Sequence, residues 1–201
     1  MGRPREHDES TASALLETAE RTIEERGIGA LSLRELASDA GTTTRAVYSL
    51  FSSKEGLLGA LGTRAFELLE EGLEALPVTD DPRADLTDAA LMFRRFALAH
   101  PALFSIGIQR TDPEAWPHFR SAASSALTVL HERFEPLAAE GLIGERSVGE
   151  AALQFHSLCE GLAAVELRGT PLTPTPERFW RDAFGVLIAG FAEPAPRRVD
   201  V

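Results

Sequence analysis

Residues 32–58 have the sequence SLRELASDAGTTTRAVYSLFSSKEGLL. The apolar spacing in the first part of this segment predicts a short helix over 33–40. Ser32 and Glu35 form a capping-box pattern at its start, because the serine side chain can bond the backbone while the glutamate reaches back. Gly41 follows the last helical position, where glycine commonly ends a helix. The segment therefore begins with a helix that a tight turn closes.

Two further helices are predicted after this turn. Thr43 can cap a short helix over 44–50, and Ser52 to Glu55 form another capping-box pattern. That second pattern opens a longer helix, which runs to about residue 75. This order of helices and glycine turn is the helix-turn-helix layout, whose second helix lies in the major groove of DNA. The interior of this small unit is predicted to contain Leu36, Ala37, Val47, Leu50 and Phe51.

The distribution of charge restricts where nucleic acid could bind. The chain of 201 residues has 20 basic and 31 acidic residues, and its net charge of −11 repels a polyanion at long range. Contact with DNA therefore requires a small, locally basic surface. From Ala40 through Lys54 the sequence has no acidic residue, and Arg45 lies within this stretch. The basic surface thus coincides with the predicted helix-turn-helix.

The same segment closely resembles the TetR family of transcriptional regulators. The family pattern is a glycine turn, a small polar residue, a hydrophobic-Tyr pair, a Phe three residues later, and Ser-Lys-Glu at the start of the fourth helix. This chain has that pattern, in order, at Gly41, Thr43, Val47-Tyr48, Phe51 and Ser53-Lys54-Glu55. The resemblance covers about residues 10–60 and implies an N-terminal DNA-binding domain.

The resemblance implies roles for residues of the second helix of the motif. Thr44 and Arg45 are expected to meet base edges, where arginine can pair bidentately with guanine. Thr43 is expected to cap the helix and to contact phosphate with its hydroxyl and nearby amides. Tyr48 is expected to place its ring on the small core and its hydroxyl on phosphate.

Further candidates for DNA contacts lie on this helix and outside it, and of these Arg34, Arg3 and Arg5 are the weaker ones. Ser49 is a secondary candidate, and Lys54 is expected to bind backbone phosphate at the start of the fourth helix. Arg34 and the arm residues Arg3 and Arg5 complete the set, since such an arm could reach the minor groove. The alternative for Arg34 is a solvated surface charge.

The remainder of the chain is predicted to be helical as well, which makes the protein all-α with about nine helices. Pro117 and Pro136 are expected to kink or split the longest helix. We expect a DNA-binding domain over 10–70, whose fourth helix is shared with a regulatory and dimerisation domain over 71–201. The other helices are expected at 8–26, 82–99, 101–109, 113–140, 147–168 and 176–191, three of them opened by Asp81-Pro82, Asp112-Pro113 and Thr175-Pro176.

The C-terminal part weakly resembles the WHG-type regulatory domains of the same family. The resemblance rests on the segments 100–104 and 155–169, but His156 stands where Trp is usual and Glu160 where His is usual. It implies a cavity for a small effector. With 11 Phe and one Tyr in the chain, a hydrophobic or aromatic effector is favoured. The candidate lining residues are Phe93, Phe96, His100, Phe104, Trp116, Phe119, Phe155, His156 and Cys159.

The last two predicted helices have apolar faces wider than one core contact requires. The family resemblance implies that they form a homodimer interface, and a twofold dimer fits a palindromic operator. The alternative is that both helices are central in a single core. The candidate interface residues are Val148, Phe155, Leu162, Phe179, Trp180, Phe184, Leu187 and Phe191. The expected function is a ligand-responsive repressor, repression being the sign found in most of the family.

Several other classes of protein fit the sequence poorly. A single cysteine, Cys159, excludes an internal disulfide and a four-cysteine zinc site. Apolar stretches are too short for a membrane helix, and the N-terminus lacks a signal-peptide core, so a cytoplasmic protein without a membrane partner is expected. We expect no catalytic residue, metal or cofactor. The alternatives are a thiol-redox regulator acting through Cys159 and a small helical enzyme that uses His156 with Cys159.

Overall fold

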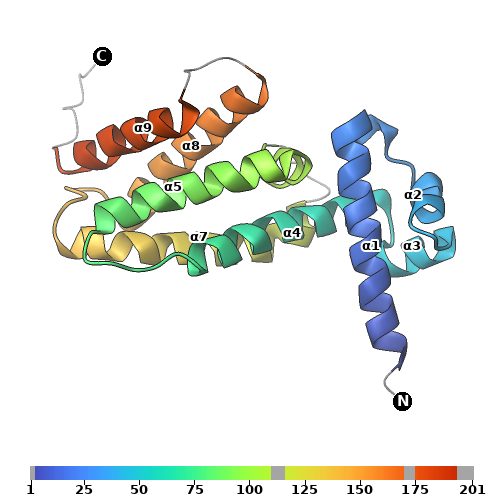
Figure 1. Cartoon of the computed structure of the whole chain (residues 1–201). Coiled ribbons are helices and arrows are strands. Elements are labelled where there is room, and N and C mark those ends of the chain that lie inside the picture. Colours follow the sequence, from blue (N-terminus) through green and yellow to red (C-terminus); the bar gives the residue numbers. More distant parts are fainter. Residues whose placement is uncertain (1–2, 110–115, 170–174, 194–201) are drawn as a thin grey trace, which may run out of the picture. The chain divides into compact units, whose positions relative to one another are not determined.

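The computed structural model describes residues 3–109, 116–169 and 175–193, and these residues contain nine α-helices, two short helices of other types and no strand. The all-α prediction is therefore confirmed. No helix within these ranges is both long and apolar enough to span a bilayer. In chain order the elements are α1 (Arg3–Arg26), the 3₁₀ helix η1 (Ile28–Ala30), α2 (Leu33–Asp39), α3 (Thr44–Phe51), α4 (Lys54–Glu74), α5 (Pro82–Ala99), α6 (Pro101–Leu103), the π-helix η2 (Phe104–Gln109), α7 (Trp116–Ala139), α8 (Val148–Leu167) and α9 (Pro176–Phe191) (Figure 1).

Most helix boundaries match the sequence-based prediction, with three differences. Helix α1 begins at Arg3, five residues earlier than expected, so the predicted arm is helical. The helix expected over 101–109 is divided into α6 and η2. Helix α7 continues through Pro136, so of the kink or split expected there, the split does not occur. Pro136 lacks the amide that would bond to the carbonyl four residues earlier, yet the helix continues for three residues beyond it. Asp112-Pro113 lies outside the described residues.

Capping side chains explain where several helices begin. The Thr43 cap on α3 is confirmed, because Thr43 Oγ1 accepts a hydrogen bond of 3.2 Å from Ala46 N. Asp81 caps α5 by accepting from two backbone amides, at 3.1 and 3.0 Å. The Ser32 capping box is wrong, because the Ser32 side chain makes no capping bond. Before α4 the cap is Ser53, one residue later than predicted, because its hydroxyl accepts from Gly56 N at 3.1 Å.

The described residues form two compact units. Unit 1 holds residues 3–67, 100–109 and 116–123, and unit 2 holds 68–99, 124–169 and 175–193. The prediction from sequence had placed residues 100–123 in the C-terminal part. Each unit has its own set of fully buried large side chains. These are Leu15, Leu57, Leu61, Leu103, Phe104 and Phe119 in unit 1, and Leu86, Phe134, Leu137, Trp180, Phe184 and Phe191 in unit 2.

Two glycines allow close packing inside unit 1. A Cβ on Gly62 of α4 would lie 2.6 Å from the ring of Phe119, which is itself buried. A Cβ on Gly107 of η2 would lie 2.9 Å from Cβ of Ala65 on α4. Both separations are shorter than side-chain contacts normally allow. Glycine at these positions therefore fixes η2 and the start of α7 against α4.

A polar network joins three helices of unit 2. Arg94 on α5 donates to the carboxylate of Glu166 on α8 through Nε, at 3.0 Å, and through Nη2. Trp180 Nε1 on α9 donates to the same carboxylate at 3.1 Å. The Arg94 and Glu166 side chains are only 18% and 15% exposed, so each charge depends on the other for its partner.

Candidate nucleic-acid interface

The turn between α2 and α3 is fixed by backbone hydrogen bonds. Gly41 has φ +66°, a conformation that glycine adopts without steric cost. Its amide donates to the carbonyl of Ser38 at 3.1 Å, while Thr42 N donates to the carbonyl of Ala37 at 2.8 Å. This pair of bonds is the Schellman motif, which satisfies the last carbonyls of α2. The chain is thereby delivered to Thr43, which caps α3.

Helix α3 has one buried side and one exposed side. Val47 is fully buried, together with Leu36 and Ala37 of α2, as the sequence predicts. The predicted core residues Leu50 and Phe51 are half-buried. The interior of the motif therefore holds α3 by one side only.

The exposed side of α3 carries the residues expected to contact DNA. Arg45, Tyr48 and Ser49 are exposed and lie three and four residues apart, which puts them on one helix face. Tyr48 is 53% exposed, so its ring lies at the edge of the motif rather than within the core. Thr44, at the first position of α3, is half-buried, and Thr43 is exposed.

A cleft of about 440 Å³ in unit 1 runs beside this face. Three of the predicted contact residues, Thr43, Arg45 and Ser49, line it. Sequence reasoning missed its other polar residues, which are Asp8 and Thr11 of α1 and Thr42 of the turn. No sequence signal links α1 to the recognition helix, because the two segments meet only after folding. The cleft is rich in hydroxyl groups, which bond phosphate oxygens readily.

The two remaining candidate cations of the motif differ in their partners. Lys54 Nζ donates to the carbonyl of Leu31 at 2.9 Å, which ties the start of α4 to the segment before α2. This bond uses one of the three ammonium protons and leaves two for phosphate. Arg34, like Arg45 on α3, is exposed and makes no ion pair or hydrogen bond within the described part of the chain. The side chains of Arg3 and Arg5 lie outside the described residues.

The candidate effector residues fall in both units. Phe93, Phe96, Phe155, His156 and Cys159 belong to unit 2. His100, Phe104 and Phe119 belong to unit 1, and the side chain of Trp116 lies outside the described residues. None of these residues lines the cleft beside α3.

Most of these aromatic side chains are core residues. Phe104 and Phe119 are at most 1% exposed, and Phe119 stacks on Phe66 with ring centres 5.9 Å apart. In unit 2, Phe155 packs against Phe184 with ring centres 4.8 Å apart. Through these contacts the aromatic residues stabilise the cores of the two units. Their proposed contact with an effector stays a prediction.

The pair His156 and Cys159 is poorly suited to nucleophilic chemistry. Cys159 is 1% exposed, and burial raises the pKa of its thiol well above the ordinary value. Since the thiolate is the reactive form, this environment suppresses reactivity. Burial also lowers the pKa of His156, whose ring meets that of Phe93 edge-on at 5.7 Å. Both side chains therefore favour their neutral forms.

The candidate interface residues divide into two groups. Phe155, Trp180, Phe184 and Phe191 are at most 3% exposed within unit 2, so they stabilise its core. The exposed apolar surface of α8 and α9 is carried by Phe179, at 37%, and by two residues that sequence reasoning did not select, Leu153 at 65% and Val186 at 75%. Val148, Leu162 and Leu187 are half-buried and can extend this surface.

Comparison with known proteins identifies both parts of the chain. The family model described as bacterial regulatory proteins, tetR family, matches residues 15–61. The model described as the tetracyclin repressor-like C-terminal domain matches residues 86–187. Among curated proteins, none matches the sequence.

Solved structures share the fold along most of the chain. A protein of unknown function from Rhodococcus sp. RHA1 is 26% identical, with a TM-score of 0.77 over 91% of this chain and 96% of that one. The TetR family regulator PfmR from Thermus thermophilus is 21% identical, with a TM-score of 0.67 over 87% and 96%. AibR, solved with isovaleryl coenzyme A and operator DNA, is 21% identical, with a TM-score of 0.67 over 89% and 98%. The two family models cover the helix-turn-helix and most of the remaining helices, and this chain therefore belongs to the TetR family of transcriptional regulators.

Proposed function

We propose that this DNA-binding regulator is a ligand-responsive repressor that binds a palindromic operator as a homodimer. The observation that carries the proposal is the exposed face of α3, where Arg45 has no partner within the described residues and no acidic residue lies between Ala40 and Lys54. An unpaired guanidinium at the start of a recognition helix is suited to bidentate bonding with guanine. The proposed division is a DNA-binding domain over 10–70 and a regulatory domain over 71–201.

The proposed homodimer rests on the apolar surface of α8 and α9. Leu153 and Val186 are among the most exposed large apolar residues of the described chain. Gly161 on α8 and Gly185 on α9 have open space where a side chain would stand, so another helix can approach both backbones closely. A twofold dimer would present two recognition helices to two half-sites about one turn of DNA apart, roughly 34–36 Å.

Ligand response is supported by the family and by one similar protein. AibR was solved with both isovaleryl coenzyme A and operator DNA. For the present chain we propose a hydrophobic effector bound in the regulatory domain. The effector would lower operator affinity by binding more tightly to a conformation that fits the operator poorly, since a ligand shifts an equilibrium only through such a preference.

Selection of bound fragments from a random DNA pool tests the proposal directly. We expect an inverted repeat to be recovered. The variant Arg45→Ala should bind that operator more weakly by about 1–3 kcal/mol and should lose preference for one base in each half-site. Arg95→Ala, which removes an exposed arginine of α5, serves as the matched control and should bind as the wild type does.

Two results would count against this function. If no sequence is enriched, the proposed operator binding is contradicted. If the enriched sequence lacks twofold symmetry, the proposed homodimer is contradicted. Equal losses of affinity on operator and random DNA for Arg45→Ala would show that Arg45 contacts phosphate rather than bases.

A further inference from the structure

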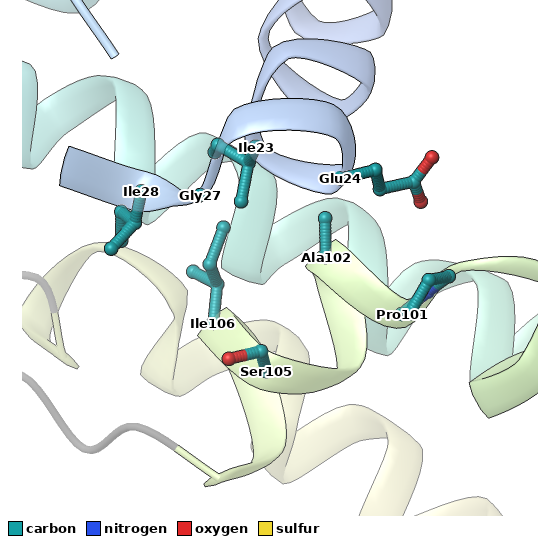
Figure 2. Close-up of a pocket in the computed structure, with 8 residues that line it drawn as sticks. All are labelled: Ile23, Glu24, Gly27, Ile28, Pro101, Ala102, Ser105 and Ile106. Atoms are coloured by element: carbon teal, nitrogen blue, oxygen red, sulfur yellow. The ribbon is translucent and has the colours of Figure 1, made fainter. Parts of the chain in front are cut away.

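A second cleft in unit 1 is lined by residues of α1, η1, α6 and η2 and by none of α3. It has a volume of about 360 Å³, within the range of small-molecule sites. One wall is the last turn of α1 with the start of η1, and the other is α6 with the first residues of η2 (Figure 2). It shares no lining residue with the cleft beside α3.

Both walls of this cavity are held in place by packing. One wall includes residues of the π-helix η2, a rare type of helix that is frequent at functional sites. The close approach of Gly107 to Ala65 fixes η2 on α4. The two walls are also joined directly, because His100 Nδ1, at the residue before α6, lies 2.7 Å from Oε1 of Glu20 on α1. A cavity with fixed walls binds a ligand without the entropic cost of ordering its own residues.

The centre of the cavity is apolar. Ile23 of α1 faces Ala102 of α6 and Ile106 of η2 across it (Figure 2). These three side chains are largely buried, at 8%, 4% and 5% exposed, and the small parts of them that line the cavity form its hydrocarbon floor. Such a floor favours the alkyl or aryl part of a ligand.

The polar groups of the cavity are few. Glu24 and Ser105 lie on different sides of Ala102 (Figure 2). Neither side chain has a hydrogen bond or ion pair within the described ranges 3–109, 116–169 and 175–193. No Lys or Arg of the described chain lines the cavity. The C-terminal end of α1, which forms one wall, adds the partial negative charge of a helix C-terminus.

We propose that this cavity binds a small organic amine, whose ammonium group pairs with the Glu24 carboxylate while its hydrocarbon part lies on Ile23, Ala102 and Ile106. The charge complementarity selects a cation over an anion or a neutral molecule. None of the residues that line this cavity is among the candidate effector-lining residues, so this proposal does not depend on the proposed effector site.

Calorimetry with n-hexylamine and 1-hexanol, which differ only in the polar head group, tests the proposal on the full chain. We expect saturable binding of both, with the amine about threefold tighter at low salt, as fits an exposed ion pair. Added salt should reduce this preference. Glu24→Gln should abolish the preference. The control Glu25→Gln, on the same turn of α1 but not part of the cavity lining, should retain it.

A blocking variant locates the binding. Ser105→Phe should fill the cavity and weaken binding of both compounds more than tenfold, with its helix content and melting temperature measured in parallel. If this variant fails to fold, the comparison of Glu24→Gln with Glu25→Gln still decides. Equal affinity for amine and alcohol, an unchanged preference in Glu24→Gln, or wild-type binding by a folded Ser105→Phe chain would each overturn the proposal.

Discussion

The cleft beside α3 contains two side chains of opposite charge. Arg45 and Asp8 both line this cleft, but they form no ion pair with each other. An approaching phosphate would therefore meet both charges. The guanidinium attracts it, whereas the carboxylate repels it. Asp8 is thus expected to reduce DNA affinity without any role in reading the sequence.

The first prediction is that Asp8→Asn strengthens DNA binding. We expect about a twofold to fivefold gain on operator and random DNA alike, since removal of an anion near the phosphates acts through the backbone. This gain in affinity should shrink as salt is added, because Asp8 and the DNA phosphates are both exposed to solvent and salt screens their repulsion. Fluorescence anisotropy with labelled duplexes at two salt concentrations measures it. Asp80→Asn, an exposed acid between α4 and α5, is the control, and a gain of similar size there would show a general charge effect.

The second prediction concerns pH and follows from the burial of His156. Burial lowers the pKa of His156 below the ordinary value for histidine, which is about 6.5. In the unfolded chain His156 takes up a proton near that pH, whereas in the folded chain it stays neutral to lower pH. The unfolded state therefore binds more protons, and the free energy of unfolding should fall as the pH drops below about 6.5.

Urea unfolding at pH 7.5, 6.5 and 6.0 measures this effect. The variant His156→Gln, which cannot take up this proton, should show a weaker dependence over the same range. Glu160, one turn further along α8, has its pKa raised by burial, and so acts in the opposite direction at lower pH. The measurements therefore stop at pH 6.0. The same slope in wild type and variant would contradict the assignment.

At the scale of elements, the helix-turn-helix depends on the backbone conformation of one turn. Gly41 has φ +66° and open space where a Cβ would stand, so its requirement is conformational rather than steric. Gly149, near the start of α8, also has open space but no positive φ. The two glycines thus share open surroundings but differ in backbone conformation.

The third prediction uses this pair. Gly41→Ala should destabilise the chain by about 1 kcal/mol, because alanine is strained at positive φ. Gly149→Ala should instead stabilise it by about 0.5–1 kcal/mol, because alanine is the better helix former. Chemical unfolding of both variants gives the two signs. Destabilisation by both changes would show that the empty space around these positions closes in solution.

The helices could be predicted from sequence because their signals are local. Apolar spacing and the caps at Thr43 and Asp81 lie within a few residues of the boundaries they set. The cleft beside α3 could not be predicted, because Asp8 and Thr11 reach it from a segment more than 30 residues away. The contact from Lys54 to Leu31 is also non-local, and it gives a predicted phosphate ligand a second task.

The non-local nature of packing also explains why only some of the candidate interface residues on α8 and α9 are exposed. A wide apolar face predicts burial, but hydrophobic burial is non-directional and does not specify the partner. Trp180 and Phe184 are consequently buried within their own unit, whereas Val186, two residues after Phe184, is 75% exposed. Sequence periodicity alone could not separate these two sides.

At the scale of the whole molecule, the proposed operator binding requires two copies of the chain. A twofold interface brings the same surface of both copies together, so one substitution changes both sides. Val186 follows Gly185 on α9; both residues are exposed, and Gly185 has open space where a side chain would stand. A charge placed here would be buried without a partner in the dimer.

The fourth prediction is that Val186→Glu dissociates the dimer and weakens operator binding at least tenfold, while a single half-site is bound as before. Twofold symmetry would place one glutamate on each side of the interface, and the substitution supplies no counter-charge to either. Sedimentation velocity gives the oligomeric state, and anisotropy on full and half operators gives the affinity. Leu127→Glu introduces the same charge at a 42% exposed leucine of α7 and should leave both unchanged. A dimeric Val186→Glu protein would place the interface on another surface, and a monomeric one with full operator affinity would separate DNA binding from dimerisation.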